Sequence, residues 1–135
     1  MYQARYLIAG YFVGKAVSTQ VSLCRVVGGS MLPTLDPTGD ILLLTSMREG
    51  TLPEVGGVYV MWHPSRQYKV IKRVCTPRED KDGQVISVAK GYVWVEGDNK
   101  RLSDDSQNYG ALPIVSILGR AQYIVWPPAR IGTVD

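Results

Sequence analysis

The sequence contains few of the residues that build metal centres. Its 135 residues include one histidine, His63, and two cysteines, Cys24 and Cys75, which do not form a CxxC pair. Structural zinc sites use four such ligands, usually in closely spaced pairs. We therefore expect no metal and no cofactor, and we expect two unpaired buried thiols rather than a disulfide.

Concentrated positive charge is also missing. The net charge is +3, and the 15 lysines and arginines are scattered along the chain. A nucleic-acid-binding domain typically carries a basic stripe with interleaved aromatic residues, so we expect no nucleic-acid partner. No internal repeat or low-complexity tract is present, and the apolar content of 45% is that of a globular protein. The length fits a single globular domain.

The longest apolar stretch lies at the N-terminus. Residues 6–14 are apolar, Lys15 interrupts them, and apolar residues resume on both sides of 18–20. A helix needs about 20 residues to cross a bilayer, so this stretch is long enough. Gly10 and Gly14 have the GxxxG spacing that suits helix association in membranes. We predict one helix over residues 1–26 that anchors the chain in a membrane, with a helix packed on the protein core as the open alternative.

Residues 27–135 are typical of β-structure. Short runs rich in β-branched and aromatic residues alternate with glycine, proline and aspartate. The runs predict strands over residues 40–45, 58–62, 67–74, 85–89, 92–96, 114–118 and 122–126. We expect a mainly β fold with an antiparallel sheet or small barrel. The polar region 97–113 is long for a hairpin connection and is either a functional loop or disordered.

One serine lies in a segment that could present its hydroxyl to a substrate. Ser30 follows Gly28 and Gly29, which free the backbone, and precedes Pro33, which fixes the direction of the chain. By itself this pattern is typical of a simple turn. A reactive serine also needs a base to accept its proton.

The chain offers two candidates for that base. His63 lies in a predicted turn, and we interpret it as a solvated loop residue rather than a member of a catalytic triad. In a strand, Lys72 shares one face with Tyr68, Val70 and Val74. Burial on such a face can lower the pKa of a lysine by several units. An edge-strand lysine that prevents aggregation is the alternative, and the spacing leaves both interpretations open.

Several segments resemble, in order, the motifs of a known peptidase family. They are residues 30–34 (SMLPT), 39–42 (GDIL), 70–74 (VIKRV), 97–99 (GDN), 103–106 (SDDS) and 126–130 (WPPAR). Any one of them is a weak signal, but the ordered set is specific. The sequence resembles type I signal peptidases, and is most similar to the mitochondrial inner membrane peptidase subunits.

The resemblance implies a role for each motif residue. Ser30 would be the nucleophile, with its backbone N–H in the oxyanion hole, and Lys72 would be the general base. Ser103 would orient the Lys72 amine, and Met31 would line the substrate groove. The supporting residues of the site would be Gly97, Asp98, Asn99 and Asp105.

Two positions depart from the family pattern. Gly28 stands where some bacterial members carry a hydroxyl that assists the oxyanion hole, so a second donor is unassigned. Gln107 stands where the family often has an arginine that pairs with the aspartate at position 105. Neither departure removes a reacting group.

The resemblance also implies a function and a location. We expect a membrane-bound serine endopeptidase of the signal peptidase I type that removes signal or sorting peptides from precursor proteins. The implied location is the mitochondrial inner membrane, with the catalytic domain in the intermembrane space; an outward-facing domain on a bacterial plasma membrane is the alternative. The implied partners are precursor proteins, the membrane and a second homologous subunit, although the sequence leaves open whether that subunit is required. A self-cleaving repressor-type Ser/Lys peptidase and a non-catalytic β-domain subunit are the alternative functions.

Overall fold

The described part of the chain is built almost entirely from antiparallel strands, as predicted. A computed structural model describes residues 5–11, 20–77, 79 and 81–135, with the backbone alone described for 5–11. The strands are β1 (Arg5–Tyr11), β2 (Gln20–Arg25), β3 (Ile41–Thr45), β4 (Val58–Trp62), β5 (Lys69–Cys75), β6 (Tyr92–Glu96), β7 (Leu112–Pro113), β8 (Ile117–Trp126) and β9 (Gly132–Thr133). The described residues also form three short helices: α1 (Ser106–Tyr109), η1 (Ile114–Ser116) and η2 (Pro128–Arg130).

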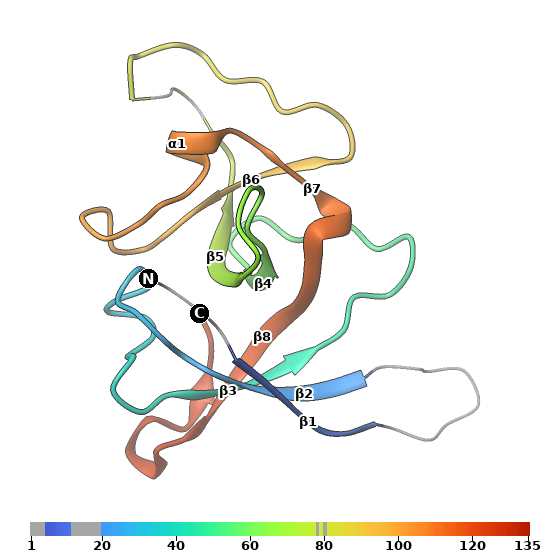
Figure 1. The fold of residues 1–135 in the computed structure, drawn as a ribbon, viewed down its shortest axis with the longest axis vertical. Coiled ribbons are helices and arrows are strands. Elements are labelled where there is room, and N and C mark those ends of the chain that lie inside the picture. Colours follow the sequence, from blue (N-terminus) through green and yellow to red (C-terminus); the bar gives the residue numbers. More distant parts are fainter. Residues whose placement is uncertain (1–4, 12–19, 78, 80) are drawn as a thin grey trace.

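One long strand joins the two halves of the sheet. The strand order is β1-β2-β3-β8-β4-β5-β6-β7, with β9 paired to β8. The second half of β8 pairs with β3, and its first half pairs with β4, as Figure 1 shows. The register shifts in both pairings, which lets the sheet bend between the halves. Because β8 pairs with both β3 and β4, the strands from the N-terminal and central parts of the chain belong to one continuous sheet.

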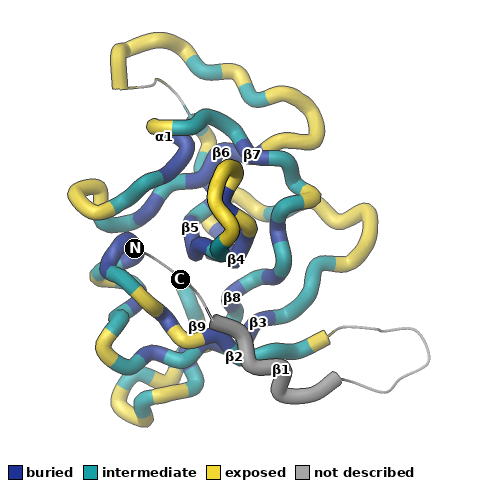
Figure 2. Tube along the Cα trace, viewed as in Figure 1, coloured by how far each residue is buried: buried dark blue, intermediate teal, exposed yellow. Residues whose placement is uncertain are grey.

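The bent sheet encloses two hydrophobic clusters. The first packs beneath β2, β3 and β8 and includes Met31, Leu35 and Leu42. The second is formed mainly by side chains of β4, β5 and β6 and includes Tyr59, Val70 and Val95. Figure 2 shows the buried residues concentrated along these strands, while the loop after β5 is largely exposed. Burial of this apolar area is the main stabilising contribution to the fold.

The N-terminal residues differ from the predicted helix. Residues 5–11 and 20–25 form the antiparallel strands β1 and β2, and β2 continues into the sheet by pairing with β3. Apolar length does not by itself distinguish a helix from a strand, and here β3 offers hydrogen-bond partners that a strand can use. The remainder of the predicted helix, residues 1–4 and 12–19, lies outside the described residues. No helix in the described ranges has the length and apolar character needed to cross a bilayer.

Two smaller predictions were wrong and one was confirmed. Residues 85–89 form no strand, because Val85 is 85% exposed and makes only an isolated bridge to Glu79. Residues 114–116 form the helix η1, so the last long strand begins at Ile117. Both cysteines are free thiols, as expected, although only Cys24 is fully buried. Burial raises the pKa of the Cys24 thiol to about 12, so this thiol stays protonated.

Candidate active site

A tight loop between β2 and β3 presents Ser30. Gly28 has a φ of 81°, a left-handed conformation that glycine adopts without steric cost. The loop is anchored by Met31 and Leu35, which are 2% and 0% exposed and pack in the first hydrophobic cluster. A hydrogen bond of 3.0 Å from the Leu35 N–H to the Met31 carbonyl closes the turn. The Ser30 side chain is thus held by a buried framework, and the role of Met31 in a substrate groove stays a prediction.

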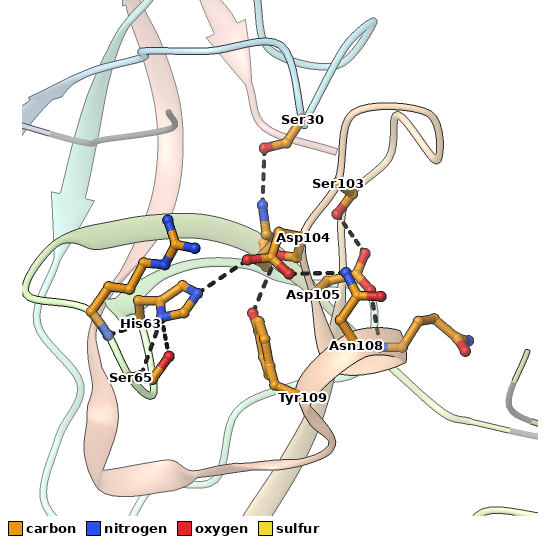
Figure 3. A network of polar contacts seen from close by, with 11 residues as sticks. Ser30, His63, Ser65, Ser103, Asp104, Asp105, Asn108 and Tyr109 are labelled. Atoms are coloured by element: carbon orange, nitrogen blue, oxygen red, sulfur yellow. Dashed lines mark hydrogen bonds and ion pairs between the residues drawn. The ribbon is translucent and has the colours of Figure 1, made fainter.

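Lys72 comes from the middle of the sheet and points at this serine. Strand β5 lies between β4 and β6, so Lys72 is not on an edge strand, and it is 1% exposed. Its neighbours at i−2 and i+2, Val70 and Val74, belong to the second hydrophobic cluster, as the alternation predicts. The Lys72 Nζ donates a hydrogen bond of 3.0 Å to the Ser30 Oγ (Figure 3). The two residues are 42 positions apart in sequence and are brought together only by the fold.

The environment of Lys72 favours its neutral form more than water does. Burial lowers the pKa of Lys72 from 10.5 to about 8, while the carboxylates of Asp105 and Asp104 act in the opposite direction. A lysine with this pKa is partly deprotonated at slightly alkaline pH. The neutral amine can then accept a proton from a hydroxyl at hydrogen-bond distance.

Asp105 organises the loop beside Lys72. Its carboxylate accepts hydrogen bonds from the Gly97 N–H at 2.9 Å and from the Ser103 hydroxyl, and it caps α1 through the Gln107 N–H at 3.0 Å. The Ser103 Oγ also accepts the Gly97 N–H at 3.0 Å. Asp105 is buried, and these three donors supply the hydrogen bonds that a buried carboxylate needs. These contacts position Ser103 next to Asp105, and its predicted action on the Lys72 amine stays a prediction.

The segment 97–99 holds the backbone of the serine loop. The Asn99 N–H donates to the Ser30 carbonyl at 2.9 Å, and the Asn99 Nδ2 donates to the Gly29 carbonyl at 3.0 Å. A Cβ atom on Gly97 would lie 2.7 Å from the Ser30 carbonyl oxygen, which is closer than such atoms approach. Glycine at this position therefore permits the two loops to touch.

Asp98 links the serine loop to the lysine strand. It accepts two hydrogen bonds from Arg73, at 2.9 Å from Nε and 2.8 Å from Nη2, and a third from the Thr34 hydroxyl. The Arg73 guanidinium and the Thr34 hydroxyl hold the pKa of the Asp98 carboxyl below its usual value, although partial burial opposes this. Arg73 directly follows Lys72, and Thr34 lies four residues after Ser30. Asp98 therefore holds together the two segments that carry Lys72 and Ser30.

Comparison with known proteins places this site in a family. A family model described as "Signal peptidase, peptidase S26" matches residues 75–126. Mitochondrial inner membrane protease subunit 2 of Danio rerio is 33% identical, over 95% of this chain and 79% of that protein. The chain belongs to the signal peptidase S26 family. Mitochondrial ATP-independent inner membrane protease subunit 1a of Arabidopsis thaliana is 35% identical over 84% of this chain and 76% of that protein. The protein is thus a serine endopeptidase of the signal peptidase I type.

The signal peptidase site departs from the family pattern at Gln107. Its backbone N–H donates to Asp105, so no guanidinium neutralises this carboxylate at that position. Within the described residues, the Gln107 Oε1 is the only buried side-chain polar atom without a hydrogen-bond partner. Asp105 therefore relies on neutral donors, and its negative charge remains available to Lys72.

The interpretation of His63 as a solvated loop residue was wrong. The His63 side chain is 4% exposed, and its Nε2 lies 3.2 Å from the Asp104 carboxylate. Sequence reasoning assigned no role to Asp104, because only the fold brings the loop 97–105 against the turn after β4. The single histidine of the chain was the one signal that could have prompted a search for an acidic partner.

Proposed function

We propose that this protein is a Ser/Lys endopeptidase in which Ser30 is the nucleophile and Lys72 is the general base. The observation that carries the proposal is the 3.0 Å contact between the Lys72 Nζ and the Ser30 Oγ. It is supported by the pKa of Lys72, which burial lowers to about 8. At a pH near 8, a lysine in bulk solvent would remain protonated and could not act as a base.

The proposed reaction follows from this geometry. The neutral Lys72 amine accepts the Ser30 proton while the Ser30 Oγ attacks the scissile carbonyl carbon. The Ser30 backbone N–H donates to the resulting oxyanion, a contribution typically worth about 3 kcal/mol. The Lys72 ammonium then protonates the leaving amine, and the peptide bond breaks to give an ester with Ser30. Water, deprotonated by Lys72, hydrolyses this ester and restores the free hydroxyl.

The remaining residues would support this chemistry. Asp98 would keep the serine loop and the lysine strand in register, and Asp105 would hold Ser103 beside the lysine. Gly97 and Asn99 would fix the backbone on either side of the nucleophile. The contacts described above support this assignment. Asp98 and Asn99 join the loop 97–105 to the serine loop, and Asp98 also joins it to the lysine strand. Asp105 holds Gly97 and Ser103 in place within that loop.

The proposed substrates are precursor proteins with cleavable signal or sorting peptides. The proposed location is the mitochondrial inner membrane, with the peptidase domain in the intermembrane space and a second homologous subunit as partner. The similarity to inner membrane protease subunits of fish, plants and yeast supports this placement. That these relatives are named as numbered subunits favours a partner subunit for this chain.

The test is a cleavage assay on candidate precursors in purified membranes, with the cut sites read by mass spectrometry. Ser30→Ala and Lys72→Ala should abolish cleavage while the circular dichroism spectrum is retained. Lys72→Arg should also be inactive, because a guanidinium does not release its proton at neutral pH. Lys90→Ala, which removes an exposed lysine, is the matched control and should cleave normally.

Other outcomes would favour another function. Substantial cleavage by either alanine variant would disprove the Ser/Lys assignment. Release of a fragment of this chain itself, with the precursors left intact, would favour the self-cleaving peptidase. Cleavage that requires a partner and survives Ser30→Ala would indicate a non-catalytic subunit.

A further inference from the structure

His63 is an enclosed ring that the proposed reaction does not use. It packs against Tyr68 and Tyr109, with ring centroids 5.0 and 5.2 Å away, and its side chain is 4% exposed. Tyr68 and Tyr109 also pack against the second hydrophobic cluster, which contains the neighbours of Lys72. A buried polar ring of this kind needs hydrogen-bond partners on both nitrogens.

The hydrogen bonds of His63 define which nitrogen carries the donor. The Nδ1 accepts the backbone N–H groups of Ser65 and Arg66, both at 3.1 Å. Since Nδ1 acts as an acceptor, the N–H of the ring is on Nε2. That N–H faces the Asp104 Oδ2 at 3.2 Å. His63 is therefore oriented by the turn that follows it and donates toward Asp104.

Asp104 is held from three directions. Besides the His63 contact, its Oδ1 accepts the Asn108 Nδ2 at 2.9 Å, and its backbone carbonyl accepts the Tyr109 hydroxyl at 3.4 Å. The Asn108 amide and the His63 ring hold the pKa of the Asp104 carboxyl below its usual value. Asp104 is therefore a carboxylate at neutral pH, although its side chain is 42% exposed.

The carboxylate of Asp104 lies on the side of His63 that faces Ser30, as Figure 3 shows. The Ser30 Oγ is the hydrogen-bond partner of Lys72, 3.0 Å from its Nζ. Asp105 and Asp104 are the two anions that act on Lys72. Lys72 also donates to the Ser30 hydroxyl of the serine loop, and Tyr59 is its cross-strand partner on β4. Tyr109 from α1 packs against the His63 ring. On β5 itself, the Arg73 guanidinium is turned to Asp98.

We propose that Asp104, fixed by His63, is a positioning residue whose negative charge stabilises the protonated form of the Lys72 amine. The inference rests on the proposed role of Lys72 as the base. In the catalytic cycle the Lys72 ammonium must persist long enough to protonate the leaving amine, and Asp104 favours that state. The same charge makes the resting lysine harder to deprotonate, so Asp104 sets the lower pH limit of activity.

The test is the pH dependence of kcat/KM for Asp104→Asn. Removing this anion should move the acid limb of the profile to lower pH by about half to one pH unit, because partial exposure of Asp104 screens its charge. Below pH 7 the variant should therefore cleave about three- to tenfold faster than the wild-type protein, since the acid limb changes tenfold per pH unit. Glu49→Gln removes an exposed carboxylate elsewhere and should leave the limb unchanged. A purely structural role would lower kcat/KM at every pH without moving the limb.

Two variants of His63 separate its two hydrogen-bonding functions. His63→Asn retains an acceptor near the position of Nδ1 but loses the donor to Asp104, so the acid limb should move in the same direction by a smaller amount. His63→Gln places an amide donor near the position of Nε2 and should retain the wild-type limb. In the Asp104→Asn background, His63→Asn should produce no further shift, because the charge that it positions is already gone.

A readout independent of cleavage distinguishes this inference from the proposed function. The Lys72 Cε resonance, assigned by its loss in Lys72→Met, can be titrated by NMR in wild-type and Asp104→Asn proteins. A lower Lys72 pKa together with the shifted acid limb supports the inference. An unchanged Lys72 pKa, or one that rises, overturns it. A lower Lys72 pKa with an unmoved acid limb would instead show that Lys72 is not the base.

Discussion

At the scale of single residues, the proposed reaction places two opposing requirements on Lys72. To accept a proton it must be neutral, which burial among Val70 and Val74 favours. To return that proton it must be stable as an ammonium, which Asp105 and Asp104 favour. The balance leaves its pKa at about 8, close to the pH at which a general base is most effective.

The pH profile of the wild-type protein follows from this pKa. Because only the neutral Lys72 can accept the Ser30 proton, kcat/KM should rise about tenfold per pH unit below pH 8 and level off above it. The measurement is the initial rate of peptide cleavage at low substrate concentration between pH 6 and pH 10. A profile that is flat through pH 8 would contradict the assignment of the base.

Lys72 should also reduce stability at neutral pH. Its pKa is lowered from 10.5 to about 8, so the unfolded chain binds more protons between these values, and stability should rise with pH in that window. Below pH 8, Lys72 is an ammonium in both the folded and the unfolded state, and burying this charge lowers the free energy of unfolding by its full amount. Lys72→Met, which keeps the volume and removes the charge, should therefore stabilise the protein at pH 7 by up to about 3 kcal/mol.

The check on Lys72→Met is urea unfolding followed at pH 7 and at pH 10.5. The gain in stability over the wild-type protein should be large at pH 7 and small at pH 10.5, because at pH 10.5 the folded lysine is neutral and the unfolded lysine is only half protonated. A gain that does not depend on pH would point to better packing by methionine rather than to removal of a charge.

At the scale of elements, the site is built where two loops meet above one strand. The loop that carries Ser30 and the loop 97–105 touch through the Asn99 hydrogen bonds and the absent side chain of Gly97. Strand β5 supplies Lys72 to the centre of this contact and Arg73 to Asp98. The geometry of the site therefore depends on how closely the two loops approach.

Gly97→Ala should damage catalysis more than stability. The new Cβ would lie closest to the Ser103 side chain and 2.7 Å from the Ser30 carbonyl oxygen, so it would displace Ser103 and the serine loop. A displacement of about 1 Å in a catalytic group can cost about 100-fold in rate, and we expect a loss of that order in kcat. Gly132→Ala is the control: its Cβ would meet nothing within 4 Å, so kcat should be unchanged. Equal activity of the two variants would show that the loops need not touch.

At the scale of the whole molecule, a buried carboxylate joins the segment before β3 to the segment after β8. Asp40, at the start of β3, is fully buried and accepts hydrogen bonds from Arg130 at 2.7 and 2.9 Å and from the Asp36 N–H at 2.9 Å. Arg130 belongs to η2, which follows the long strand β8. The same guanidinium also contacts the serine loop, since Arg130 donates to the Thr34 carbonyl at 3.3 Å.

Asp40→Asn should lower the thermal stability of the whole domain. It removes the charge that pairs with Arg130 and one of the acceptors for three hydrogen bonds. Because breaking a buried ion pair is costly, we expect Tm to fall by roughly 5–10 °C. Glu54→Gln, which breaks the exposed pair with Arg120, is the matched comparison and should change Tm by about 1 °C or less. Equal shifts would mean that the burial of Asp40 does not matter.

Most of the interior strands could be predicted from the sequence alone. Runs of β-branched and aromatic residues between turn residues defined β4 and β6 with their observed bounds, because such side chains favour extended backbone. The period of two along a strand placed Lys72 on an apolar face with Val70 and Val74. The ordered motifs selected Ser30 and Lys72 as partners without any information on their distance.

Features that depend on contacts between distant segments became clear from the folded arrangement. It showed that Lys72 lies on an interior strand, that residues 5–11 and 20–25 pair as strands, and that His63 is enclosed against Asp104. Local patterns define the tendency of a segment, but burial and ionisation depend on which other segments cover it. For this protein, the proposed nucleophile and base could be selected from the sequence, but the packing that sets the protonation of Lys72 could not.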